Sequence, residues 1–279
     1  MGLIERDDGW RMPDWLWQKI EPLLPPAPPH PLGCHRARIP DRRVMDAILL
    51  VLRTGMQWNA LRATGTCNSS SAHRRFQEWE RAGVFHEIWR RGLLDYDATV
   101  GIDWAWLAAD GAMTKAPLGG PDTGPNPTDR AKSGWKWSVA TDRWGVPLGW
   151  VIDAANRNDS VLLEPTLQAV ADRGLLLDVE TLHLDRGYDS NVTLQRCTDL
   201  GLTDIVCAKR RPKGSPKAKK PLTLGMRWPV ERTNSWFSNF GQLRRNTDRH
   251  PKQRLGQVAL AVALILTIKL VKWAKRWTD

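Results

Sequence analysis

The chain has 279 residues, of which 42% are hydrophobic and 25% are charged, and its net charge is +11. This balance is ordinary for a globular protein with a buried core, and it excludes collagen-like and wholly disordered chains. Residues 209–279 hold 18 Lys or Arg and 3 Asp or Glu, a net charge of +15. So basic a segment indicates either a polyanionic partner or a solvated, solubilising tail.

Apolar spacing in residues 1–100 predicts helices. One helical pattern ends at the proline run 25–31, and a second begins at Asp41 and ends at Gly55. Ser69–Ser71 are expected to cap a third helix that buries one apolar face. We therefore expect an all-α domain here.

A helix, a glycine turn, a short segment and another helix are compatible with a helix-turn-helix DNA reader. The third helix turns Arg74 outward, and we assign Arg74 and its neighbour Arg75 to DNA. Helical hairpins with exposed arginines are also common in proteins that bind no DNA. Residues 1–100 are thus predicted to be a helical DNA-binding domain, with the second reading left open.

Residues 101–279 change to a pattern of strands and helices. Short apolar or alternating runs predict five strands, at residues 104–109, 136–141, 147–152, 179–184 and 204–208. Helices are expected at residues 159–173 (capped by Asp159-Ser160), at 191–200, from Pro229, and over 254–276, with a basic loop at 209–226. Three successive strands followed by strand–helix alternation predict a mixed sheet flanked by helices, which is an α/β fold.

Two further features bear on location. The four cysteines, Cys34, Cys67, Cys197 and Cys207, are scattered without a Cys-x-x-Cys pair, which predicts reduced thiols. The uncharged stretch 258–268 is shorter than a membrane span of about 20 residues, so it is expected to be a buried helix. With no signal-peptide pattern at its start, the chain is expected to be cytoplasmic and not bound to membranes.

Three acidic residues fall at topologically comparable points of the predicted sheet. Asp110 ends the first strand, Asp185 ends the fourth, and Glu231 lies in the first turn of the helix that starts at Pro229. Ligands of α/β sheets gather at the carboxyl ends of strands, where these side chains would meet. Taken singly, each acid also fits a turn or a helix start.

Such a group of carboxylates suits metal-dependent phosphodiester chemistry. Two divalent ions, about 3.5–4 Å apart, activate the attacking oxygen and stabilise the leaving one. Mg²⁺ prefers oxygen ligands, so we expect two Mg²⁺ ions, with Mn²⁺ able to substitute.

Several segments resemble conserved blocks of bacterial insertion-sequence transposases of the DDE type, in insertion-sequence families four and five. They are residues 109–117 (ADGAMTKAP), 129–136 (DRAKSGWK), 155–159 (ANRND), 183–189 (HLDRGYD), 227–233 (RWPVERT) and 243–245 (LRR). The resemblance covers residues 13–272. In the broader group a tyrosine often precedes the Arg227 position by three residues and a lysine follows the glutamate by seven, whereas this chain has Leu224 and Ser238 there. Roles of that tyrosine and lysine are therefore not carried over.

The resemblance implies a ribonuclease-H-like catalytic domain over residues 101–279 behind the helical DNA-binding domain. Asp110, Asp185 and Glu231 would be the metal-binding catalytic triad. The partners would be double-stranded DNA, as terminal inverted repeats and as target, bound by at least a dimer.

Basic residues near the triad are the expected DNA contacts. Arg227 and Arg232 flank Glu231 and are assigned to phosphates as charge-assisted donors, in preference to ion pairs with the acids. Arg130, Lys132 and Lys136 either face the substrate or lie on a solvated turn, and Arg244 and Arg245 complete the set. We expect Asp159 to start a helix, in preference to being a fourth metal ligand.

The sequence thus predicts a DNA transposase that cleaves transposon ends and joins them to target DNA. Two rivals stay open. One is a related nuclease without strand transfer, and the other is a non-enzymatic DNA-binding protein derived from a transposase.

Overall fold

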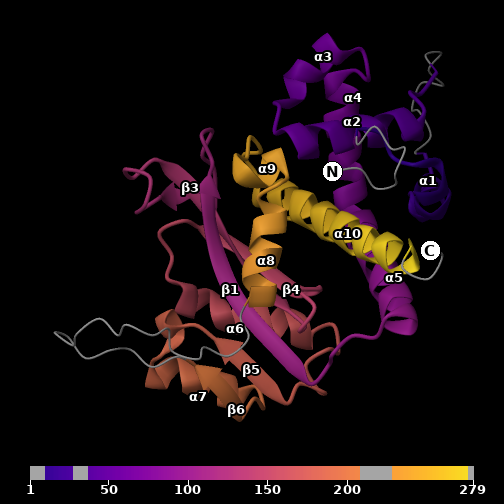
Figure 1. The fold of residues 1–279 in the computed structure, drawn as a ribbon. Coiled ribbons are helices and arrows are strands. Elements are labelled where there is room, and N and C mark those ends of the chain that lie inside the picture. Colours follow the sequence, from indigo (N-terminus) through magenta and orange to yellow (C-terminus); the bar gives the residue numbers. More distant parts are fainter. Residues whose placement is uncertain (1–9, 28–36, 208–227, 276–279) are drawn as a thin grey trace. The chain divides into compact units, whose positions relative to one another are not determined.

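The computed structural model describes residues 10–27, 37–207 and 228–275. The chain divides into two compact units, which we describe separately (Figure 1). The helical unit comprises residues 1–100 and 237–279, and the sheet unit comprises residues 101–236. The expected basic loop 209–226 and Arg227 lie outside the described residues.

The helical unit is built of α-helices and short 3₁₀ turns. The helices are α1 (Asp14–Ile20), α2 (Asp41–Thr54), α3 (Leu61–Thr64), α4 (Ser69–Arg81), α5 (Val84–Thr99), α9 (Gly241–Arg244) and α10 (Pro251–Lys275); the turns are Glu21–Leu23 and Trp58–Ala60. Helix α2 ends as expected, because Gly55 adopts the left-handed conformation (φ 73°) that glycine tolerates best. The cap of α4 differs from the prediction. Asn68, and not Ser69–Ser71, accepts the capping hydrogen bond, from the Ser70 amide.

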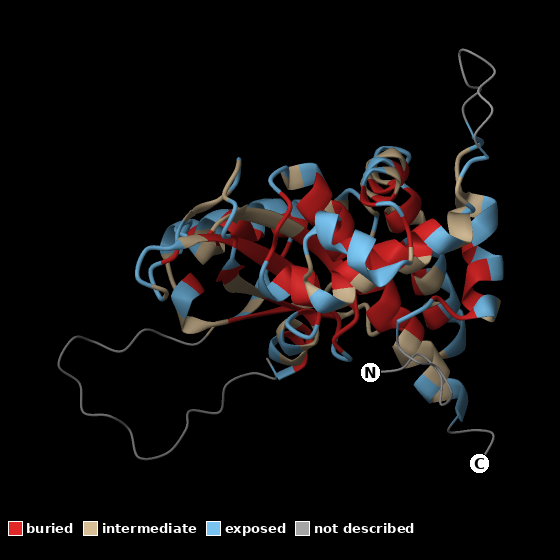
Figure 2. Ribbon diagram, turned by 90° about the horizontal axis from the view of Figure 1, so that it is seen from above, coloured by how far each residue is buried: buried red, intermediate tan, exposed pale blue. Residues whose placement is uncertain are grey.

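Helix α10 forms the core of the helical unit. Residues 258–266 are all buried, which confirms the predicted buried helix, and α10 packs along α5. By length and composition α10 is also apolar enough to cross a membrane, but 67% of its most apolar window is buried inside the protein. Figure 2 shows buried residues on the inward sides of the helices and exposed residues on their outward sides. Residues 237–279 therefore group with the N-terminal helices, in contrast to the predicted second domain, which spans 101–279.

The sheet unit contains one mixed sheet. Its strands are β1 (Trp106–Lys115), β2 (Gly124–Pro125), β3 (Ser133–Thr141), β4 (Pro147–Ala154), β5 (Thr181–Leu184) and β6 (Asp204–Cys207). The order is β2-β3-β1-β5-β6, and β4 pairs with β3. β3 runs antiparallel to both β1 and β4, whereas β5 and β6 are parallel to β1. This is the predicted ribonuclease-H-like mixed sheet, and it is flanked by α6 (Asp159–Ala171), α7 (Asn191–Asp199) and α8 (Trp228–Phe237).

Two details of the sheet unit differ from the prediction. β1 does not end at Ala109 but continues through Asp110 to Lys115, because β3 pairs with it over that whole length. Helix α6 is capped by Asn158, whose side chain accepts from the Ser160 amide, and Asp159 is the first helical residue. The predicted Asp159 cap is therefore corrected by one position.

Alternate residues of β1 face different helices, as the pleat of a strand requires. Gly111 lies against Asp159 of α6, since a Cβ added to Gly111 would be 2.3 Å from the Asp159 Oδ1 atom. Asp110, one residue earlier, is hydrogen-bonded to Asn234 of α8. Helices α6 and α8 thus lie on opposite faces of the sheet at this point.

Candidate active site

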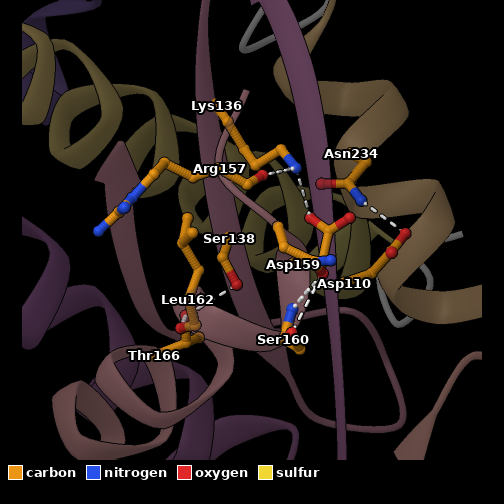
Figure 3. Close-up of polar contacts among 10 residues, drawn as sticks. Asp110, Lys136, Ser138, Arg157, Asp159, Ser160, Leu162, Thr166 and Asn234 are labelled. Atoms are coloured by element: carbon orange, nitrogen blue, oxygen red, sulfur yellow. Dashed lines mark hydrogen bonds and ion pairs between the residues drawn. The ribbon is translucent and has the colours of Figure 1, made fainter. Parts of the chain in front are cut away.

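Asp110 lies where the sheet changes from parallel to antiparallel pairing. β5 pairs only with residues 106–108 of β1, and beyond them β1 continues with β3 alone as its partner. The Asp110 side chain is partly buried, and its Oδ2 accepts a hydrogen bond from the Asn234 Nδ2 atom at 3.1 Å (Figure 3). The carboxylate is therefore on the α8 face, beside the end of a neighbouring strand.

Asp185 is placed at the same level by the register of the parallel pair. Ala108 of β1 is paired with His183 of β5, so Asp110 and Asp185 each follow that pair by two residues. Residues paired in register, and residues two apart along a strand, point to the same face. Asp185 keeps an extended backbone (φ −85°, ψ 172°) before the 3₁₀ turn Arg186–Tyr188. Its carboxylate accepts the Gly187 amide and thereby caps that turn.

His183 places an uncharged aromatic ring near Asp110 and Asp185. Its ring packs against Trp106 in a tilted arrangement with the ring centroids 4.6 Å apart, and the residue is 9% exposed. Burial lowers the pKa of His183, against an opposing effect of Asp204. The imidazole is therefore neutral at pH 7 and does not neutralise the neighbouring carboxylates.

Glu231 is exposed in the first turn of α8. It precedes Asn234 by three residues, which puts both side chains on one side of the helix. Since Asn234 bonds Asp110, Glu231 lies on the side of α8 that meets the sheet near Asp110. In the part of the chain that the structure describes, however, no three His, Cys, Asp or Glu side chains are grouped closely enough to hold a metal ion.

The donor chemistry of this face fits a hard divalent cation. Asp110, Asp185 and Glu231 supply only carboxylate oxygens, the ligands that Mg²⁺ prefers. Carboxylates on one face of a sheet repel one another in the absence of a cation, which favours separated side chains in this state. Two carboxylates carried by the sheet and a third on the opposing helix are a donor set of the kind that Mg²⁺ can share with substrate phosphates.

Lys136 was expected to face DNA, and the structure corrects this. Its side chain is 4% exposed, its Nζ is 2.9 Å from Asp159 Oδ1, and it donates to the Arg157 carbonyl at 2.8 Å (Figure 3). Asp159 lies at the start of α6, on the opposite face from Asp110, in agreement with the preferred reading as a helix start. Lys136 was misassigned because its partner, at the start of a helix, is far away in the sequence.

Arg75 is corrected for the same reason. It is 5% exposed and donates to the Ile39 carbonyl and the Asp41 carboxylate, so it joins the start of α2 to α4. Arg74, which directly precedes Arg75, is exposed as predicted. A helix-turn-helix reading of this region thus retains Arg74 and loses Arg75 as a DNA contact.

Arg232 has partners that neither of the predicted roles included. Its guanidinium lies over the rings of Trp228 and Trp236, 4.2 and 4.8 Å from their centroids. It also donates to the Trp144 carbonyl at 2.8 Å. Stacking of this kind holds the side chain against the turn between β3 and β4.

The remaining predicted DNA contacts are all on exposed positions. Arg130 and Lys132 lie in the loop between β2 and β3, and Arg244 and Arg245 lie at the end of α9. Arg130 has a positive φ of 51°. These four residues keep their assignment as a prediction.

Asn234 is the site residue that the sequence did not indicate. Its side chain bonds Asp110 and also accepts a hydrogen bond from Trp137 Nε1 at 2.9 Å. Its spacing of three residues from Glu231 was the available signal, because that spacing puts it on the same helix face. The partner at Asp110 is 124 residues away and is visible only in the fold.

Comparison with known proteins is consistent with this geometry. Residues 12–89 match the family described as "Putative transposase of IS4/5 family", and residues 107–266 match the family described as "Transposase DDE domain". The chain is 38% identical over 136 residues to the "Putative transposase for insertion sequence element IS402" of Burkholderia cepacia, covering 47% of this chain and 62% of that one. It is 34% identical over 116 residues to the "Insertion element IS402 uncharacterized 16.2 kDa protein" of the same organism, covering 41% of this chain and 79% of that protein.

Solved structures give a weaker comparison. In "Mos1 transposase paired-end complex with left transposon end" the aligned chain is 11% identical, with 85% of this chain and 81% of that chain covered. The TM-score is 0.26, which is too low to support an argument about the fold.

Proposed function

Because the chain belongs to the family of transposases with a DDE domain, we propose that it cleaves DNA at transposon ends and joins them to target DNA. The observation that supports this proposal best is the placement of Asp110 and Asp185 at one level of adjacent strands, on the face where α8 carries Glu231. Asp110 and Asp185 are carried by the sheet and Glu231 by the opposing helix. The three carboxylates meet at a shared centre when the Glu231 side chain turns inward.

In this proposal Asp110, Asp185 and Glu231 hold two Mg²⁺ ions, and Mn²⁺ can replace them. When bound, the ions activate the attacking oxygen and stabilise the charge on the leaving oxygen. Asp110 and Asp185 provide the fixed part of the site, since Asp110 is part of β1 and Asp185 directly follows β5. Glu231, exposed on α8, supplies the part that moves toward them.

The proposed reaction has two steps. Water attacks the phosphorus at the transposon end, the bond to the 3′ oxygen breaks, and that oxygen takes up a proton. The 3′-hydroxyl then loses its proton and attacks a phosphorus of the target strand. The bond from that phosphorus to the target's own 3′ oxygen breaks and this oxygen takes up a proton, so one phosphodiester bond forms for the one that breaks. No covalent bond between protein and DNA is needed. The proposed phosphate contacts are the exposed residues Arg74, Arg130, Lys132, Arg244 and Arg245, together with Arg227 and Arg232.

We further propose that two or more copies act together on two terminal inverted repeats in the cytoplasm. Cutting and joining both ends of one element requires two active sites. Contacts to phosphates position DNA without reading its sequence, so repeat specificity would come from the helical unit.

A nicking assay on supercoiled plasmid DNA tests the proposed activity. The wild-type protein should nick DNA with Mg²⁺ or Mn²⁺ and not with EDTA, and Asp185→Asn should lower the rate by at least about 10³-fold, as expected for a residue of the reacting centre. Asp153→Asn, a carboxylate of β4 paired with Arg157, is the matched control and should nick at the wild-type rate. Equal rates for wild type and Asp185→Asn would refute the assignment.

The same preparation distinguishes the two rival functions. A nuclease without strand transfer would nick plasmid but would not join pre-cut transposon ends to a target. A non-enzymatic DNA-binding protein would shift the mobility of such ends and leave every phosphodiester bond intact.

A further inference from the structure

Asn234 has an amide whose orientation is fixed by its neighbours. The indole nitrogen of Trp137 carries a hydrogen and can only donate, and Trp137 is 1% exposed. The Asn234 atom that faces the indole at 2.9 Å must therefore be the carbonyl Oδ1. The other end of the same planar amide, Nδ2, is then necessarily the atom that faces Asp110 Oδ2 at 3.1 Å.

With its amide in this orientation, Asn234 presents only a hydrogen-bond donor to Asp110. An amide nitrogen only donates, so Asp110 Oδ2 is held as an acceptor and the carboxylate is kept from rotating freely about its own bond. One lone pair of Oδ2 is thereby committed to Asn234. Trp137 belongs to β3 and is paired with Ala112, so the residue that fixes the amide orientation is part of the sheet.

Helix α8 does not depend on Asn234 for its position. Thr233 Oγ1 donates to the Gly145 carbonyl at 2.8 Å, and Arg232 donates to the Trp144 carbonyl at 2.8 Å. Both bonds join α8 to the turn between β3 and β4. Removing the Asn234 amide therefore leaves both of these anchors of the helix in place.

We propose that Asn234 is a positioning residue that orients the Asp110 carboxylate for cation binding, with Trp137 fixing the direction of its amide. This inference rests on the proposed function, because it gives Asp110 the role of a metal ligand. Partners that orient a metal ligand typically change metal affinity or activity by about 10–100-fold when they are removed.

Two substitutions and one control test the proposal. Asn234→Leu keeps the size of the side chain and removes both hydrogen bonds. Trp137→Phe leaves Asn234 in place but removes the donor that fixes the amide direction, so the amide can turn its oxygen toward Asp110. Ser235→Ala, at the exposed next position of α8, is the matched control.

Three measurements are made on the full-length protein. Binding of Mn²⁺ alone is followed by the loss of the free-ion EPR signal. The steady-state nicking rate is separated into kcat and KM for DNA. Indole N–H resonances are recorded with ¹⁵N-labelled tryptophan, and the Trp137 signal is identified by its disappearance in Trp137→Phe.

Asn234→Leu is expected to weaken Mn²⁺ binding and lower kcat by about 10–100-fold, with KM for DNA within about twofold of wild type. It should also shift the Trp137 N–H resonance upfield. Trp137→Phe should cause a smaller loss of the same kind, and combining it with Asn234→Leu should cause no further loss, because both act through one amide. Ser235→Ala should match wild type in every measurement.

Wild-type Mn²⁺ affinity and kcat in Asn234→Leu would overturn the positioning role while leaving the proposed function intact. Independent, additive losses from Asn234→Leu and Trp137→Phe would also overturn it. If the wild type binds Mn²⁺ through Asp185 but cuts no DNA, the proposed function fails, and the Mn²⁺ affinities still decide the role of Asn234.

Discussion

At the scale of single residues, the ion pair of Lys136 and Asp159 supports the sheet directly behind the candidate site. The Lys136 side chain, which carries the ammonium, is almost fully buried, whereas the Asp159 side chain is 41% exposed. Gly111 lies against the Asp159 carboxylate, where any Cβ would force it away. The absence of a side chain at Gly111 is thus what allows α6 to start against this point of β1.

The two partners of this pair should respond differently to substitution. Asp159→Asn leaves a buried ammonium whose charge is not balanced, which we expect to lower the free energy of unfolding by about 2–3 kcal/mol. Lys136→Met removes the buried charge, and the exposed Asp159 can be hydrated, so we expect a loss of about 1 kcal/mol or less. Urea unfolding at pH 7 measures both. Equal losses would show that the ammonium is not isolated from water.

Asp248 is the residue for which the structure predicts a pH dependence of stability. It is 3% exposed and accepts a hydrogen bond from Trp58 Nε1 at 2.7 Å and one from Gln257 at 3.3 Å. Burial raises its pKa above the ordinary 3.8, and these two hydrogen bonds oppose that rise. The folded state therefore holds the Asp248 proton more tightly than the unfolded state does.

For an acid with a raised pKa, the stability contribution falls as pH rises from the unfolded pKa through the folded one, and it is constant above. Asp248→Asn removes the contribution of this carboxyl group to the pH dependence of stability. Relative to wild type, the variant should become more stable as pH rises from about 4, measured by urea unfolding at a series of pH values. A difference in unfolding free energy that stays constant with pH would contradict the prediction.

At the scale of elements, the sequence predicted most of the sheet and helices because each is marked locally. Alternating or continuous apolar runs indicated β3, β4 and β5, and glycine or proline indicated the ends of α2 and the start of α8. The caps were misplaced by one residue, since Asn and Ser or Asp are adjacent at both sites and have similar preferences. Lys136 and Arg75 were misassigned because burial of a charged side chain depends on a partner far away in the chain.

Contact between α2 and α9 is so close that it requires glycine. A Cβ added to Gly241 would lie 2.3 Å from the Thr54 carbonyl carbon and the Gly55 nitrogen, both backbone atoms. A Cβ added to Gly92 of α5 would meet only the end of the Leu266 side chain, at 3.3 Å. One glycine is thus fixed by backbone contact and the other faces a movable side chain.

Alanine should therefore be destabilising at Gly241 and nearly neutral at Gly92. Gly241→Ala must displace α9 from α2, and we expect it to cost about 2–3 kcal/mol of unfolding free energy. Gly92→Ala gains up to about 1 kcal/mol of helix propensity, offset by a small shift of Leu266, so its net effect should stay within about 1 kcal/mol. Thermal and urea unfolding compare them. A stable Gly241→Ala protein would mean that α9 can move away without loss.

At the scale of the whole molecule, the sequence indicated two domains but not how the chain is shared between them. Residues 237–279 return to the helical unit after the sheet unit is complete. The apolar stretch of α10 predicted a buried helix but carries no information on its partner, which is α5. The carboxylates of the candidate site could be named from predicted strand ends and a predicted helix start, although β1 continues past Asp110. Asn234 and Trp137 emerged only from the folded arrangement.

The most direct measurement of the central claim is a crystal structure with Mn²⁺ and a transposon-end DNA, using anomalous scattering to locate the metal. We predict Mn²⁺ bound by the carboxylates of Asp110 and Asp185, with Glu231 turned toward them and Asn234 still bonded to Asp110. Mn²⁺ bound elsewhere, or Asp110 and Asp185 binding no common ion, would contradict the account.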